Sequence, residues 1–136
     1  MFCTPGRSAA PEITAELMRL LQGCGLVELI PEEQMDAVSV IAGCGPAYVY
    51  AYGAALAKAG EAIGLGRKAA QRYAAQMMLG SAQMMLETEK TPEELKNEVC
   101  SPGGTTIEGV RVLENGGLEA LAGAAVAASF RRTRGL

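Results

Sequence analysis

The stretch Cys100-Ser101-Pro102-Gly103-Gly104-Thr105-Thr106-Ile107-Glu108-Gly109 joins a tight turn to the start of a helix. Ser-Pro favours a turn, and the two glycines permit a positive φ and a close approach of the backbone. Thr105 is suited to be the helix N-cap, and Glu108, three residues later, would complete a capping box. Because the first amides of a helix lack hydrogen-bond partners at its positive end, we expect a binding site for a phosphate or a carboxylate. A plain capped helix without any ligand is the alternative that the local sequence leaves open.

Helical patterns lie on both sides of this stretch. Upstream, Thr91-Pro92-Glu93-Glu94 reads as a second capping box with proline in the first turn, and it predicts a short helix through Val99. Downstream, the helix that begins at Thr105 is expected to end near Glu114, since Asn115-Gly116-Gly117 suits a C-terminal cap. An alanine-rich helix is expected over residues 118–132.

The first two thirds of the chain are also mainly helical in pattern. Apolar residues follow helical spacing in four segments, residues 11–22, 32–42, 46–63 and 67–87. The Gly-Cys-Gly-Pro sequence at 43–46 is expected to break the second helix from the third. Residues 26–30 instead predict a short strand. Since we find no second convincing strand, this one is expected to pair with another chain, to lie at an edge, or to remain from a sheet that is otherwise missing.

The composition of these helices favours self-association. The helix at 46–63 is apolar or small on nearly all sides, and the helix at 67–87 carries a stripe of methionines, which is typical of cores and subunit interfaces. Alanine-rich helices each bury little apolar area, so a bundle of this composition gains stability by packing against a copy of itself. We therefore expect a homodimer, with a higher oligomer left open.

Composition and charge exclude several classes of function. The 136 residues suit one globular domain, and the net charge of −3 gives no footprint for nucleic acid. Four cysteines without a C-x-x-C pair and the absence of histidine argue against a metal site and a disulfide framework, and they exclude Ser-His-Asp and Cys-His catalysis within this chain. The longest apolar run, 46–57, is too short to span a membrane, and we see no signal peptide. We expect a soluble, cytoplasmic protein without a membrane partner.

Two motifs carry a resemblance to a known family. The first is Met35-Asp36-Ala37-Val38 followed by Gly43-Cys44-Gly45-Pro46-Ala47-Tyr48, and the second is Glu-Leu-Lys-Asn-Glu-Val-Cys-Ser-Pro-Gly-Gly-Thr-Thr at 94–106. In order and spacing, residues 11–134 resemble the C-terminal part of pyrroline-5-carboxylate reductase. The resemblance implies hydride transfer from NADPH or NADH to the C=N bond of pyrroline-5-carboxylate, which gives L-proline.

The resemblance also implies a fold and a domain organisation. Residues 31–136 would form a mainly α, helical-bundle dimerisation domain of the 6-phosphogluconate-dehydrogenase-like C-terminal type. Residues 1–30 would be the last helix and strand of a Rossmann-type nucleotide-binding domain. No G-x-G-x-x-G follows an N-terminal strand, so NADPH or NADH would be bound mainly by a domain missing from this sequence. We therefore expect the chain alone to be inactive.

Residues of the turn acquire roles from the same resemblance. The substrate carboxylate would be bound by Ser101, Gly103, Gly104, Thr105 and Thr106. Thr106 would also be catalytic, as a hydrogen-bond partner or proton donor near the imine nitrogen. Cys44, Gly45 and Pro46 would line the site more distantly. Family members commonly carry Ser-Gly-Ser-Gly-Pro where this chain has Ala-Gly-Cys-Gly-Pro at 42–46, so weaker contacts are expected there. A non-catalytic helical dimerisation module and a reductase of another cyclic imine stay open as alternatives.

Overall fold

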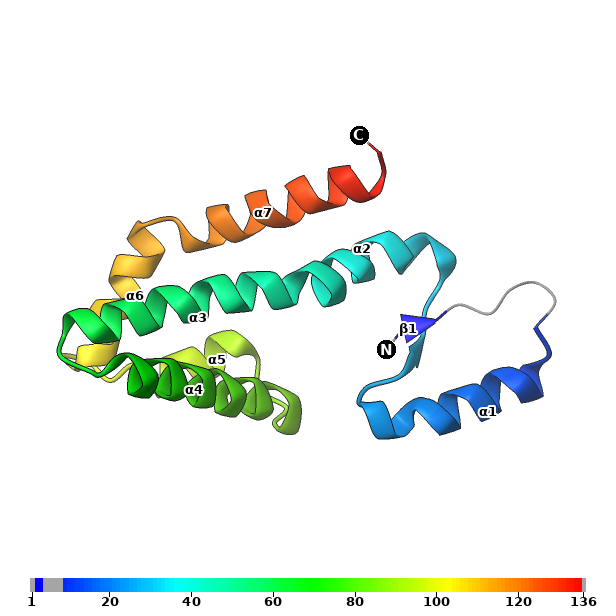
Figure 1. Ribbon diagram of the computed structural model, residues 1–136, viewed down its shortest axis with the longest axis horizontal. Coiled ribbons are helices and arrows are strands. Elements are labelled where there is room, and N and C mark those ends of the chain that lie inside the picture. Colours follow the sequence, from blue (N-terminus) through cyan, green and yellow to red (C-terminus); the bar gives the residue numbers. More distant parts are fainter. Residues whose placement is uncertain (1, 4–8, 136) are drawn as a thin grey trace. The chain divides into compact units, whose positions relative to one another are not determined.

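The computed structural model describes residues 2–3 and 9–135, and helices dominate it (Figure 1). The helices are α1 Pro11–Leu21, α2 Met35–Ser39, α3 Gly45–Ala62, α4 Arg67–Glu87, α5 Pro92–Glu98, α6 Thr105–Asn115 and α7 Leu118–Thr133. Short 3-10 turns lie at Gln22–Cys24 and Glu32–Gln34, and a π-helical turn lies at Val40–Cys44. The prediction of a mainly α fold is confirmed. The chain forms two compact units, Met1–Gly45 with Ala125–Leu136 and Pro46–Ala124.

The first unit begins with a β-α-β arrangement. Strand β1, Phe2–Cys3, pairs in parallel with β2, Glu28–Leu29, and α1 lies between them in the sequence. The strand predicted at 26–30 is therefore present, and its partner is in the same chain. We missed β1 because two residues are too few to show the alternation that marks a strand. A parallel strand pair joined by a helix is the repeating unit of α/β sheets.

The predicted helix break at 43–46 is wrong. Helix α2, the π-helical turn and α3 follow one another without a gap, so the backbone is helical over residues 35–62. In a regular α-helix the ring of Pro46 would clash with the carbonyl of Ala42. The wider π turn, in which the Gly45 N–H donates to the Val40 carbonyl, relieves that clash. Val40 is only 1% exposed and anchors this segment.

Because α2, the π-helical turn and α3 are continuous, the apolar segment is longer than predicted and its length must be compared again with that of a membrane span. Within the described residues, one segment, Glu32–Ala62, has the length and mean hydropathy, 1.3, of a spanning helix. The prediction that the apolar run is too short assumed a break at 43–46, and that break is absent. Length and composition are shared by membrane spans and by apolar helices of protein interiors and interfaces, so they do not decide between these surroundings.

The second unit contains a close contact between α3 and α4 (Figure 1). A Cβ built on Gly53 would lie 2.7 Å from Cε of Met78, so the methionine side chain occupies the space that any larger residue would need. Nearer the connection of the two helices, a Cβ on Gly60 would lie 3.3 Å from Cβ of Ala70. Ala57 and Ala70 are buried there. Small residues thus allow the two helices to pack closely.

Candidate functional site

The turn before α6 has the geometry of a type II β-turn. Pro102 occupies the second position, and Gly103, at the third, has a φ of +73°. The Gly104 N–H donates to the Ser101 carbonyl over 3.0 Å, which closes the turn. Glycine adopts this φ at little cost, whereas a residue with a Cβ is strained there. The prediction of a positive φ in the Gly-Gly pair is confirmed at Gly103.

Gly104 allows the Ser101 side chain to lie against the start of α6. A Cβ on Gly104 would be 2.5 Å from Oγ of Ser101 and 3.1 Å from its carbonyl oxygen. Both distances are shorter than ordinary van der Waals contacts, so a side chain at this position would displace the Ser101 hydroxyl and crowd its carbonyl, although the φ of −77° suits any residue. The Ser101 hydroxyl therefore lies beside Gly104, the N-cap residue of α6.

The predicted capping box of Thr105 and Glu108 is wrong. The N-cap of α6 is Gly104, its first helical residue is Thr105, and no side chain caps this N-terminus. Glu108 pairs instead with Arg111, with 2.7 Å between Oε1 and Nη1. The helix starts one residue earlier than predicted, because an extended glycine can itself occupy the N-cap position. The first amides of α6 thus keep their capacity to donate to a ligand.

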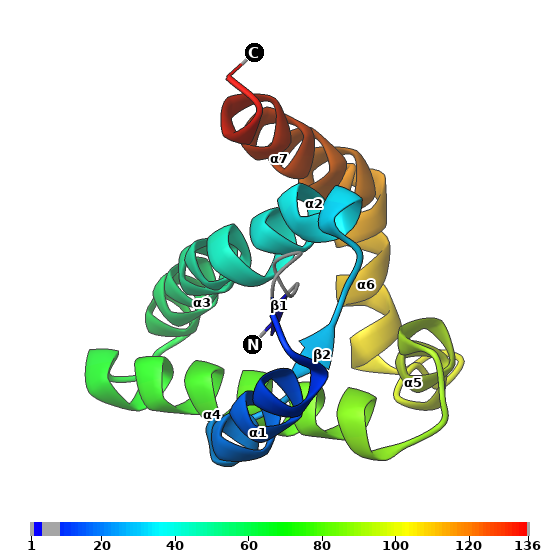
Figure 2. The same cartoon turned by 90° about the vertical axis from the view of Figure 1, so that its right-hand side faces the viewer.

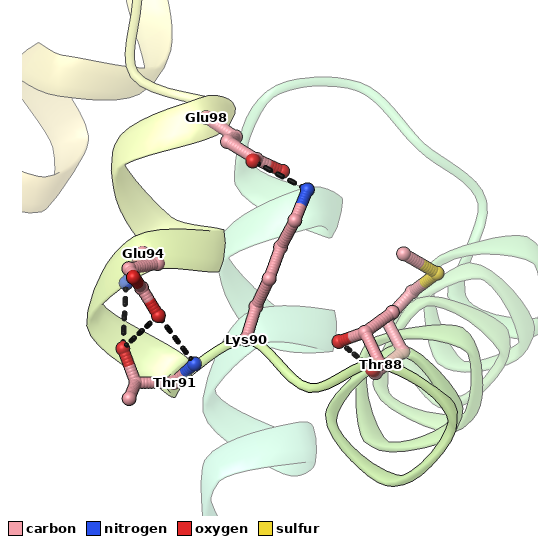
Figure 3. Close-up of polar contacts among 6 residues, drawn as sticks. Thr88, Lys90, Thr91, Glu94 and Glu98 are labelled. Atoms are coloured by element: carbon pink, nitrogen blue, oxygen red, sulfur yellow. Dashed lines mark hydrogen bonds and ion pairs between the residues drawn. The ribbon is translucent and has the colours of Figure 1, made fainter.

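The other predicted capping box, at the start of α5, is present (Figure 3). Oγ1 of Thr91 accepts a hydrogen bond from the Glu94 N–H over 3.3 Å. Oε2 of Glu94 accepts from the Thr91 N–H over 2.7 Å and from its hydroxyl over 2.8 Å. These hydrogen bonds, the backbone one first, hold the pKa of the Glu94 carboxyl below its usual range. This N-terminus is satisfied from within the chain.

Lys96 links α5 to α6. Its Nζ lies 2.7 Å from Oε1 of Glu114 on α6 and 2.5 Å from Oε1 of Glu93 on α5. The Glu114 hydrogen bond, and then that of Glu93, raise the pKa of the Lys96 ammonium above its usual range. Our sequence reasoning missed this group, because Lys96 and Glu114 are 18 residues apart and no local pattern relates them.

The structure brings the predicted site residues into two groups. Ser101, Gly103, Gly104, Thr105 and Thr106 lie together in the turn and the first residues of α6, and both threonines are exposed. Cys44 ends the π-helical turn with a free, partly buried thiol, and Gly45 and Pro46 begin α3. That the two groups form one site stays a prediction. In the described part of the chain, no three acidic or cysteine side chains are grouped as a metal site would need.

Comparison with known proteins gives the family. A family model described as pyrroline-5-carboxylate reductase dimerisation matches residues 32–136. The chain belongs to the pyrroline-5-carboxylate reductase family. Pyrroline-5-carboxylate reductase 3 of Bos taurus is 45% identical over 90% of this chain and 40% of its own length. Pyrroline-5-carboxylate reductase of Escherichia coli K12 is 44% identical over 86% of this chain and 44% of its own length.

Solved structures give the same result. A pyrroline-5-carboxylate reductase from Coxiella burnetii superimposes with a TM-score of 0.91 and 32% identity, over 98% of this chain and 50% of that chain. The Plasmodium falciparum pyrroline carboxylate reductase with NADP bound gives a TM-score of 0.87 and 29% identity, over 96% and 52% of the two chains. The chain thus spans about half the length of the pyrroline-5-carboxylate reductases that it matches.

The NADP in that relative raises the question of whether this chain offers a dinucleotide site. Such a site needs several glycines between a strand and the N-terminus of the next helix, so that the pyrophosphate can approach the backbone. Between β1 and α1 the sequence has one glycine, Gly6, and α1 begins at Pro11 after Ala10. The residues present in this chain therefore do not fit a dinucleotide of this kind.

Proposed function

We propose that this chain is the dimerisation and substrate-carboxylate-binding part of a pyrroline-5-carboxylate reductase. The whole protein would reduce the C=N bond of pyrroline-5-carboxylate to L-proline with NADPH or NADH. One observation carries the proposal: within the region that matches the family model, α6 presents an uncapped N-terminus directly after a glycine turn. Because the dinucleotide does not fit the residues present, the contribution of this chain is to bind and orient the substrate.

The carboxylate of the substrate suits the start of α6. The first amides of the helix are donors without helical partners, and the helix dipole favours a negative charge at this end. Hydrogen bonds to a charged acceptor are stronger than those between neutral groups. The Ser101 hydroxyl adds a further donor, and the two glycines leave the backbone open to approach. A carboxylate bound here would have its ring fixed relative to the helix.

Thr106 is our candidate for the group beside the imine nitrogen. It is the second residue of α6, its side chain is exposed, and its hydroxyl is not used as a cap. A carboxylate at the preceding amides would place the rest of a small ring near this side chain. The hydroxyl can then donate a hydrogen bond to the ring nitrogen, which is the role that the family resemblance implies.

We also propose that the chain forms a homodimer through its helices. The exposed surface is 10470 Å². Two compact units with half of this chain's mass each would together expose about 8,000 Å². Large apolar side chains are among those exposed, including Tyr50 at 74%, Ile63 at 84% and Leu86 at 82% exposure. The family model of a dimerisation region supports a second copy as the partner that covers them. Light scattering at micromolar concentration should give twice the chain mass, and a monomeric mass would contradict the dimer.

A cytoplasmic location is part of the proposal. Cys24, Cys44 and Cys100 are free thiols in the described part of the chain, which suits a reducing compartment. Fractionation of cells that express the protein should recover it with soluble markers. Recovery with the membrane fraction would contradict this location and would make the apolar segment Glu32–Ala62 a candidate membrane span.

Carboxylate binding at the start of α6 can be tested by comparing two ligands in an NMR titration of the purified, amide-labelled protein. L-Proline, the product, should shift the amide signals of Gly103, Gly104, Thr105 and Thr106. Pyrrolidine has the same ring without the carboxylate and serves as the matched control, which should leave these signals in place. A response to neither ligand, in a protein that still self-associates, would favour the non-catalytic dimerisation module instead.

A further inference from the structure

The 101–104 turn lies between two helices that one group of charges connects. Lys96 of α5 reaches across to Glu114 of α6 while it also pairs with Glu93 on its own helix. Among the side chains that the structure describes, no other ion pair or hydrogen bond runs between α5 and α6. The two helices lie on either side of the turn in sequence and next to each other in space (Figure 2).

The same three side chains border a hollow of about 470 Å³ between α5, α6 and the start of α7. Its other walls are mostly apolar, with Val110, Leu113 and Leu118 among them. Side chains that face a hollow lose the dispersion contacts that would otherwise fix one helix against the other. The charged link therefore carries a larger share of the relative position of α5 and α6 than it would in a packed core.

Helix α5 is well held at its own two ends. The Thr91 capping box fixes its first turn, and Lys90 reaches its last residue, Glu98, with 2.5 Å between Nζ and Oε1 (Figure 3). Only residues 99–104 separate α5 from α6. These contacts hold α5 together, and the pairing of Lys96 with Glu114 ties α6 to it, so the two ends of the short connection are held relative to each other.

We propose that Lys96 and Glu114 are positioning residues, which act through α5 and α6 to hold the 101–104 turn in the geometry that binds the substrate carboxylate. The inference rests on the proposed function of that turn. Exposed ion pairs contribute little to global stability. A displacement of about 1 Å in a binding group, by contrast, can change a rate by about a hundredfold. Loss of the pair should therefore affect substrate binding more than folding.

The test uses the full-length protein and measures turnover of pyrroline-5-carboxylate with NADPH. Lys96→Met and the isosteric Glu114→Gln should each raise the KM for the imine by about tenfold, because the turn amides are displaced from the carboxylate. The KM for NADPH and the melting temperature should stay near wild type. The double variant Lys96→Glu with Glu114→Lys restores the pair with reversed charges. It is made in a Glu93→Gln background, because Glu93 would otherwise face a like charge at position 96, and it should recover most of the loss.

Arg111→Gln is the matched control. It breaks the Glu108–Arg111 pair, which is also exposed, also lies on α6 and also measures 2.7 Å, but which joins no second helix. Its KM for the imine should equal that of wild type. If both single variants keep the wild-type KM, or if they raise the KM only together with a clear fall in melting temperature, the positioning role is wrong.

Amide signals separate failure of this inference from failure of the proposed function. In ligand-free protein, Glu114→Gln should shift the Gly103 and Gly104 amide signals, and Arg111→Gln should not. If wild type does not turn over the imine but these shifts occur, the proposed function is wrong and the link between helices and turn stands. If the shifts are absent, the link is overturned whatever the activity.

Discussion

Helices α5 and α6 begin in opposite ways within the same unit of the fold. The N-terminus of α5 is closed by its own chain, through reciprocal hydrogen bonds between Thr91 and Glu94. The N-terminus of α6 follows a type II turn, has Gly104 as its N-cap and receives no side-chain hydrogen bond. The sequence suggested a capping box at both places, since each has a threonine followed three residues later by a glutamate.

This difference shows how a helix N-terminus that is available to a ligand can be told apart from one that only stabilises its helix. Polar groups at helix ends are normally satisfied from within the protein, by water or by a ligand. At α5 the chain itself supplies the acceptor, and the helix gains stability. At α6 the glycines remove the side chain that would cap it, so the donors remain for a ligand. The proposed carboxylate-binding site is thus the helix N-terminus that the chain leaves uncapped.

The largest effect is expected from removal of the hydroxyl at the uncapped end. In the full-length enzyme, Thr106→Ala should lower kcat by about a hundredfold if the hydroxyl bonds or protonates the imine nitrogen. Single-turnover kinetics would measure the chemical step directly. Thr91→Ala, which removes the hydroxyl of the capped end, is the control and should leave that step unchanged. An unaltered rate in Thr106→Ala would limit this residue to a structural role.

A methyl group at Gly104 should have the next largest effect. In Gly104→Ala the new Cβ would displace the Ser101 hydroxyl, which lies 2.5 Å from its position. Loss of a hydrogen bond to a charged group costs about 1.5 kcal/mol or more, so the KM for the imine should rise by about tenfold. Gly109→Ala is the control on the same helix, because nothing lies within 4 Å of its Cβ. Equal kinetics in both variants would contradict the steric argument.

The free energy of unfolding should depend on the hydroxyl at the capped end of α5 and not on that at the uncapped end of α6. Thr91→Ala removes the cap of α5 and should lower the free energy of unfolding by about 1 kcal/mol. Thr105→Ala removes a hydroxyl that caps nothing, so its free energy of unfolding should change by less than about 0.5 kcal/mol. Urea denaturation of the two variants beside wild type would measure the contrast. A larger loss for Thr105→Ala would mean that α6 is capped by this residue in solution.

The smallest expected effect concerns pH. The capping box lowers the pKa of Glu94 from its usual value of 4.5 in the folded state. A lowered folded pKa stabilises the protein above the unfolded pKa, and that contribution is lost as the pH falls through the folded pKa. Melting temperatures of wild type should therefore fall more between pH 6 and pH 3 than those of Glu94→Gln. Parallel curves would show that the box contributes nothing that depends on ionisation.

Local patterns predicted much of this fold because most of its structure is local. Helical periodicity located most of the helices, Ser-Pro predicted the turn, and the Gly-Gly pair predicted its positive φ, which is found at Gly103. The features that the sequence did not predict depend on a shift of one residue or on partners that are distant in the sequence. The N-cap of α6 differs from the prediction by one residue, and Lys96 finds Glu114 only after α5 and α6 pack. The π-helical turn at Val40–Cys44 contradicted a rule that holds for regular helices.

The contact of Gly53 with Met78 gives the α3–α4 packing a sensitivity to oxidants. The terminal methyl of Met78 fills the space beside the glycine, and the side chain is partly exposed. Oxidation of its sulfur to the sulfoxide adds a polar oxygen to a close apolar contact. Peroxide should therefore loosen the packing of these two helices at this contact, and a sulfoxide reductase should restore it.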